Sequence, residues 1–202
     1  MKLALLGSLT LAGSALANLD AAAIIKQIAP NSVSCAGATP DCRTANQVAP
    51  HAVHSMSHYG LYSPKEMAAV LALMAFESAD FKYKHNVYPG RPGQGTANMQ
   101  MPSFNLKYAQ SIPAVKGKVA GIGSADGLPA AKLNEILALV TPDEYNFGSG
   151  PWFLATQCPG AVRDALKGNV DEGFKQYMAC VGVAVTSERL AYFNRAKQAF
   201  HL

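Results

Sequence analysis

The sequence lacks a hydrophobic run long enough to cross a bilayer. Beyond the N-terminus, no segment of the 202 residues reaches the roughly 18 uninterrupted apolar residues that such a helix needs. At the N-terminus, Lys2, the apolar run Leu3–Leu11 and the small-residue ending Ala15–Ala17 are typical of a secretory signal peptide. We therefore expect residues 1–17 to be removed before Asn18, and the mature protein to be secreted and extracellular, with no membrane partner.

Cysteine is scarce, and its spacing excludes the common zinc motifs. The four cysteines include no C-x-x-C pair, and the chain has no Asn-x-Ser/Thr sequon. In an exported chain, four cysteines indicate two disulfides with three possible pairings. Because Cys35 and Cys42 frame a short Gly/Pro loop and Cys158 and Cys180 flank a helical stretch, the spacing favours pairing within each local couple.

The chain also lacks internal repeats and any linker that would divide it. Removal of the signal peptide leaves about 185 residues, which suits one domain, 18–202, with a real hydrophobic core. The formal charge of +4 falls to +3 without Lys2, and the charges are dispersed. A nucleic-acid partner is therefore not expected, whereas a mildly basic surface suits the approach to an anionic polymer.

The hydrophobic pattern is helical almost throughout. Apolar spacing and capping signals predict helices over Leu19–Ile28, Arg43–Tyr59, Pro64–Ser78, Pro129–Val140, Pro142–Phe147, Pro159–Lys167, Asp171–Cys180 and Ser187–Phe200. The segment His85–Pro102 contains several prolines and glycines and cannot be helical. We expect a small β-hairpin lobe there, which makes the fold class α+β, mainly α.

Glu77 is a candidate catalytic residue because it lies at the end of a predicted helix, on the face that carries the apolar residues. Ser63, Pro64 and Glu66 predict the start of this helix through a capping box, and the apolar spacing continues from Val70 to Glu77. A carboxyl group held against apolar neighbours favours its protonated form, as a general acid requires. The alternative is a helix-end glutamate that faces water or pairs with a nearby lysine.

Three segments carry a family resemblance. They are Phe76-Glu77-Ser78, then Gly95–Pro102 with the letters GTANMQMP, and Tyr145–Pro151 with the letters YNFGSGP. In this order they resemble the lysozyme-like superfamily, in particular its goose-type lysozyme and lytic transglycosylase branch. The resemblance spans somewhat under half of the mature chain and leaves out both disulfide regions.

The resemblance implies a lysozyme-like fold and a site for an amino-sugar polymer. Glu77 would protonate the glycosidic oxygen. The implied substrate-binding residues are Asn98, Met99, Gln100, Tyr145 and Asn146. Tyr88, in a loop rich in tyrosine and proline, suggests a platform on which a sugar ring could stack, although it could equally pack the hairpin against the helices.

A second carboxylate is missing from its expected place. Most glycosidases use two carboxylates, yet no Asp or Glu occurs in His85–Met101. Asp80, Asp143 or Glu144 could serve instead, although Asp143 and Glu144 also suit the first turn of a helix. A lytic transglycosylase uses a single Glu, so the pattern is compatible with either a hydrolytic or an anhydro product.

His51, His54 and His58 form a rival constellation. The last two lie four residues apart on one helix face, which is a workable metal-ligand spacing. The H-E-x-x-H pattern is absent, however, so we expect no metal and no other cofactor. These histidines are better explained as surface groups that gain charge below neutral pH.

Taken together, the sequence predicts a secreted, monomeric muramidase that cleaves the β-1,4 bonds of peptidoglycan with Glu77 as its acid. A chitinase or chitosanase would share the helix-end glutamate and is distinguished by which polymer is cut. A non-catalytic glycan-binding protein is the alternative outside enzymes.

Overall fold

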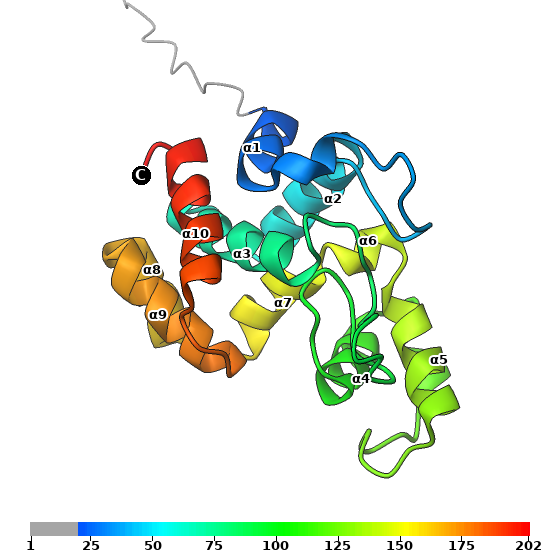
Figure 1. The fold of residues 1–202 in the computed structure, drawn as a ribbon. Helices are drawn as coiled ribbons and strands as arrows, with labels where there is room; N and C mark the ends of the chain where they lie inside the picture. The colour runs from blue at the N-terminus through cyan, green and yellow to red at the C-terminus, as the bar shows by residue number, and fades with distance from the viewer. Residues whose placement is uncertain (1–19) are drawn as a thin grey trace, which may run out of the picture.

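The structure is a computed structural model that describes residues 20–202, so the predicted signal peptide lies outside the described residues. The described chain is a series of helices (Figure 1). Their bounds are α1 Ala21–Ile28, η1 Pro30–Val33, α2 Ala45–His58, α3 Pro64–Glu77, α4 Pro102–Ser111, η2 Lys116–Val119, α5 Ala130–Val140, α6 Asp143–Asn146, α7 Ser149–Thr156, α8 Gly160–Gly168, α9 Val170–Val181 and α10 Ser187–Ala199.

The helices expected from apolar spacing are present, with ends that differ by one or two residues. The sequence analysis missed α4 and α7, which both carry proline near the start, at Pro102 and Pro151. Proline is tolerated in the first turn of a helix because its missing N–H has no partner there in any case.

The β-hairpin expected within His85–Pro102 is wrong, and with it the α+β class and the lysozyme-like fold. Between residues 20 and 202 no strand forms, and the segment makes only two isolated bridges, from His85 to Gly95 and from Gly95 to Gln100. Thr96 and Met99 have positive φ angles of 64° and 44°, which turn the backbone away from an extended ladder. The fold is mainly α.

Helix α3 lies at the centre of the molecule (Figure 1). Every residue from Ala68 to Ala75 is buried, so the helix is apolar on all sides and not on one face. Helices α1, α7, α8, α9 and α10 all pack against it. At Gly150 of α7, an added Cβ would lie 2.5 Å from the sulfur of Met74, so glycine permits the close approach of these two helices.

A second core lies under α4, α5 and η2. Tyr108 of α4 packs against Trp152 of α7 with 4.8 Å between the ring centroids, and Phe104 lies 4.7 Å from Phe153. Trp152 and Phe153 are both buried. Helix α7 thus joins the two cores, since its other residues contact α3.

Two disulfides brace the chain and join the pairs that the local spacing favours. Cys35 and Cys42 close the loop before α2, and Cys158 and Cys180 tie the end of α7 to α9.

Within residues 20–202, no helix combines the length and the apolar character needed to span a bilayer.

The start of α3 carries a buried charge. Glu66 is 2% exposed and, instead of closing a capping box, accepts a hydrogen bond of 2.6 Å from Nε of Arg163 on α8. Nη2 of the same guanidinium donates to the carbonyl oxygen of Gly60 at 2.7 Å. The ion pair therefore fixes α8 to the first turn of α3.

We expect Arg163→Leu to lower the free energy of unfolding by about 3 kcal/mol, because it leaves the Glu66 carboxylate buried without its partner. The double variant Glu66→Leu/Arg163→Leu should lose less, since no orphaned charge remains. Urea denaturation measures both. Lys167→Leu, at an exposed ion pair on the same helix, is the control and should change little. A double variant less stable than Arg163→Leu would contradict this account.

Candidate functional sites

Glu77 lies at the end of α3, where an arginine from the far end of the chain meets it. Nη2 of Arg189, on α10, donates to Oε1 of Glu77 at 2.8 Å, and the guanidinium also covers the ring of Phe76 at 4.6 Å. The Glu77 side chain is 20% exposed. Within residues 20–202, its carboxylate accepts a hydrogen bond from Arg189 and from none of the other predicted site residues. The geometry is that of an ion pair joining two helices.

Asp80 is a structural residue in the turn after α3. It is buried, and its oxygens accept hydrogen bonds from the backbone N–H of Asn31 at 3.0 Å and from the hydroxyl of Tyr192 at 2.7 Å. Burial and the hydrogen bond to Asp80 raise the pKa of Tyr192 to about 12. Both oxygens of Asp80 are thus occupied in holding η1 and α10 to this turn.

The loop predicted to contact substrate faces the protein interior. Gln100 is buried, and its Nε2 donates to Oδ1 of Asn105 on α4 at 2.8 Å. Asn98 is also buried, and Met99 accepts at its carbonyl oxygen from the side chain of Gln94 at 3.0 Å. Oδ1 of Asn98 and Oε1 of Gln100 have no hydrogen-bond partner among the described residues. These contacts anchor the loop to α4.

The predicted site residues Tyr145 and Asn146 lie at the end of α6. The carbonyl oxygen of Tyr145 accepts a hydrogen bond of 2.9 Å from the buried hydroxyl of Tyr108, whose pKa burial raises. Tyr145 and the exposed Glu144 line a hollow of about 280 Å³ together with His54 and His58. Asn146, by contrast, is buried. Tyr88 is 91% exposed at a loop tip, so it packs against nothing in the described chain.

The three histidines of α2 do not build a metal centre. His51 stacks on Phe147 with centroids 6.0 Å apart, and His54 and His58 stack on each other at 6.3 Å. Among residues 20–202, no group of three His, Cys, Asp or Glu side chains is placed to hold a metal ion.

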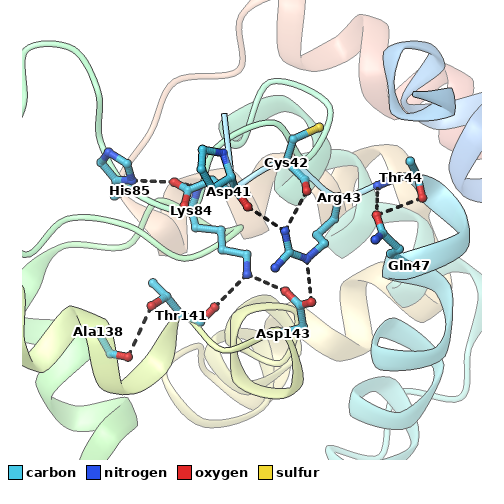
Figure 2. Close-up of polar contacts among 11 residues, drawn as sticks. Asp41, Cys42, Arg43, Thr44, Gln47, Lys84, His85, Ala138, Thr141 and Asp143 are labelled. Carbon is cyan, nitrogen blue, oxygen red and sulfur yellow. Dashed lines mark hydrogen bonds and ion pairs between the residues drawn. The ribbon is translucent and has the colours of Figure 1, made fainter. Parts of the chain in front are cut away.

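The structure does gather one polar cluster that the sequence analysis missed, and Asp143 is its centre (Figure 2). Nε of Arg43 donates to Oδ2 of Asp143 at 2.6 Å, and Nζ of Lys84 donates to Oδ1 at 2.5 Å. Partial burial raises the pKa of the Asp143 carboxyl, but the hydrogen bonds from Arg43 and Lys84 outweigh this and hold the pKa below its ordinary value. An aspartate so held is ionised and has little basicity.

A histidine–aspartate contact lies beside this cluster (Figure 2). Nδ1 of His85 is 2.6 Å from Oδ2 of Asp41, which also accepts from the backbone N–H of Lys84 at 3.2 Å. The carboxylate engages Nδ1, and the His85 side chain is 55% exposed. A hollow of about 460 Å³ is bordered by Asp41, Arg43, Lys84 and His85. The sequence signal was the position of Asp41 inside a disulfide loop.

An apolar hollow lies between α1, α2, α3 and the C-terminal end. Its volume is about 340 Å³. The apolar side chains that line it are Ala21, Ile24, Ile25, Ala52, Val53, Met56, Leu61, Met67, Leu71 and Phe200. Val53 and Tyr62 are 56% and 71% exposed at its rim, and the Tyr62 hydroxyl donates to the carbonyl oxygen of Ser57 at 3.2 Å. No predicted site residue borders it.

Comparisons with known proteins point away from glycan chemistry. The chain is 58% identical over 157 residues to a Fusarium oxysporum (strain Fo5176) protein named bifunctional dioxygenase (DOX)-epoxy alcohol synthase (EAS). The match covers 77% of this chain and 12% of the Fusarium protein, so the chain spans about an eighth of that relative. No protein-family model matches the chain, and no solved structure matches it.

The relative overturns the expected function. Its name describes oxygen chemistry and not hydrolysis of a glycosidic bond. The expectations of a lysozyme-like muramidase, a glycoside hydrolase and a peptidoglycan partner are therefore wrong. The chitinase and glycan-binding alternatives lose their support with them. The two expected disulfides are present in the structure.

We expect Asp143→Asn to lower the free energy of unfolding at neutral pH by about 1–2 kcal/mol. The variant loses the negative charge that strengthens the hydrogen bonds from Arg43 and Lys84. Partial contact with solvent screens these bonds and keeps the loss small. The folded-state pKa of Asp143 is depressed, so its stabilisation is present above the ordinary aspartate pKa and is lost as pH falls through the folded value. The difference between wild type and variant should therefore shrink below about pH 3.8. Urea denaturation at several pH values measures it, and a constant difference would contradict the assignment.

Proposed function

We propose that this chain is an accessory module that binds an apolar organic molecule in the hollow between α1, α2 and α3. The single observation that carries the proposal is the apolar lining of that hollow, described above. Its volume of about 340 Å³ falls within the range of pockets that take small molecules. The polar groups at the rim, Ser57 and the Tyr62 hydroxyl, suit a ligand with an oxygen function at one end.

The relative supports this choice of ligand class. Its name includes an epoxy alcohol synthase, and an epoxy alcohol is an organic molecule with two oxygen functions. This chain matches 12% of that protein, which leaves most of the relative outside the match. We therefore assign binding to this module and no oxidative step to its residues.

Ligand binding should raise the melting temperature of the purified protein. At a ligand concentration about a hundred times Kd, the stabilisation is about 2.7 kcal/mol, which corresponds to roughly 5–10 °C for a domain of this size. Decanol and epoxydecane are suitable probes, with butanediol as the polar control. Differential scanning fluorimetry measures the shift.

A variant at the rim tests the location. Val53→Trp places a large ring over the hollow at a position that is 56% exposed, so folding should be retained while the thermal shift is lost. Val33→Trp makes the same change at a position that is 64% exposed on η1, outside the hollow, and should keep the shift. Equal shifts in both variants, or none in the wild type, would refute the proposal.

We infer further that the module is exported. The signal-like residues 1–17 and the pairing of all four cysteines support this inference, because disulfides persist in oxidising compartments. Expression of the chain in a fungal secretion host should deliver to the medium a protein whose N-terminal sequence begins at Asn18. Retention inside the cell with Met1 intact would contradict it, and replacing Leu5 by Arg within the apolar run is the control that should block export.

A further inference from the structure

Although the basic residues are dispersed along the chain, the acidic residues are not. The stretch 81–125 holds six of the 17 Lys and Arg residues and none of the 13 Asp and Glu residues. It contains the loop between α3 and α4, then α4 itself and η2. All the acidic side chains lie outside this stretch, so the net positive charge of the described chain comes from this one region.

Large apolar side chains are exposed in the same region. Tyr88 is 91% exposed, Val87 is 54% exposed and Met101 is 39% exposed. Oδ1 of Asn86 accepts hydrogen bonds from the backbone N–H groups of Gly90 and Arg91, at 2.8 and 3.1 Å. These bonds close the loop tip around Asn86 and leave Val87 and Tyr88 pointing outward.

The exposed apolar groups and the cations lie on a continuous surface. Nη1 of Arg91 is 3.2 Å from the sulfur of Met101, which connects the loop tip to the start of α4. On the next turns of α4, Nζ of Lys107 lies over the ring of Phe104, 5.3 Å from its centroid. We name this surface, formed by Val87, Tyr88, Arg91, Met101 and Lys107, the basic loop face. In Figure 1 it belongs to the green segments around α4, away from α8 and α9.

Lys84 is paired with Asp143, but among residues 20–202 no ion pair engages Arg91 or Lys107. Helix α5 packs beside the loop, where Oδ1 of Asn134 accepts from the backbone N–H of Gly93 at 2.9 Å. The adjacent Glu135 is paired with Lys132 at 2.8 Å. Arg91 and Lys107 therefore keep their charges available at the surface.

We propose that the basic loop face docks onto an anionic lipid surface. Val87 and Tyr88 enter the headgroup region, where a tyrosine ring is well accommodated, and Arg91 and Lys107 contact the lipid phosphates. Exposed apolar groups flanked by cations suit a membrane better than a nucleic acid, because a nucleic acid offers no apolar medium for the loop tip. This docking is independent of the apolar hollow, which lies on α1, α2 and α3.

Vesicle co-sedimentation tests the proposal with the purified protein. It should bind vesicles of phosphatidylcholine mixed equally with phosphatidylserine, and bind vesicles of phosphatidylcholine alone much more weakly. Arg91→Gln should weaken binding about fivefold, and Val87→Ser/Tyr88→Ser about tenfold or more, because the first removes one cation and the second removes two inserted side chains. Raised salt should weaken binding of the wild type.

Matched variants elsewhere separate this surface from net charge. Lys175→Gln removes one exposed cation on α9, and Val33→Ser removes one exposed apolar side chain on η1, so both should bind like wild type. Val53→Trp should also bind vesicles normally, even where it has lost ligand binding. Three results would overturn the proposal: no binding to anionic vesicles, equal weakening by Lys175→Gln, or unchanged binding of Val87→Ser/Tyr88→Ser.

Discussion

The complete burial of α3 is the constraint on which the rest of the structure depends. A helix with no solvent-facing side from Ala68 to Ala75 must be surrounded, and α1, α7, α8, α9 and α10 do so. Its small residues allow close approach, as Gly150 of α7 does from the other side. An ordinary amphipathic helix would have required partners on one face only.

The charged residues at the two ends of α3 belong to this arrangement. Glu66 at the start meets Arg163 of α8, and Glu77 at the end meets Arg189 of α10. Each pair joins α3 to a helix about a hundred residues away, so both fix the positions of the C-terminal helices. Asp143 does the same for the other half of the molecule, where it holds the segment before α2 and the loop after α3.

The two surfaces for which we propose binding roles lie outside the tight packing around α3. The apolar hollow opens where α1, α2 and the C-terminal end meet around α3, and the basic loop face projects from the region without acidic residues. They are separate surfaces with different chemistry, one suited to a small apolar molecule and the other to an anionic membrane. About seven-eighths of the Fusarium relative, whose name describes oxygen chemistry, lies outside the match.

The sequence by itself determined most helices, because apolar spacing and capping residues act over a few neighbouring positions. It also favoured the local disulfide pairs that form. It did not reveal α4 or α7, and it predicted a hairpin in a segment whose backbone turns at Thr96 and Met99.

Only the tertiary structure decided the candidate sites. The partner of Glu77 is 112 residues away in the chain, and the partners of Asp143 are 100 and 59 residues away, so no local pattern could reveal them. An apolar line of residues ending in Glu77 predicted a desolvated acid, whereas folding placed Arg189 against it. Local forces specify elements, but the environment of a charge depends on which distant segments pack beside it.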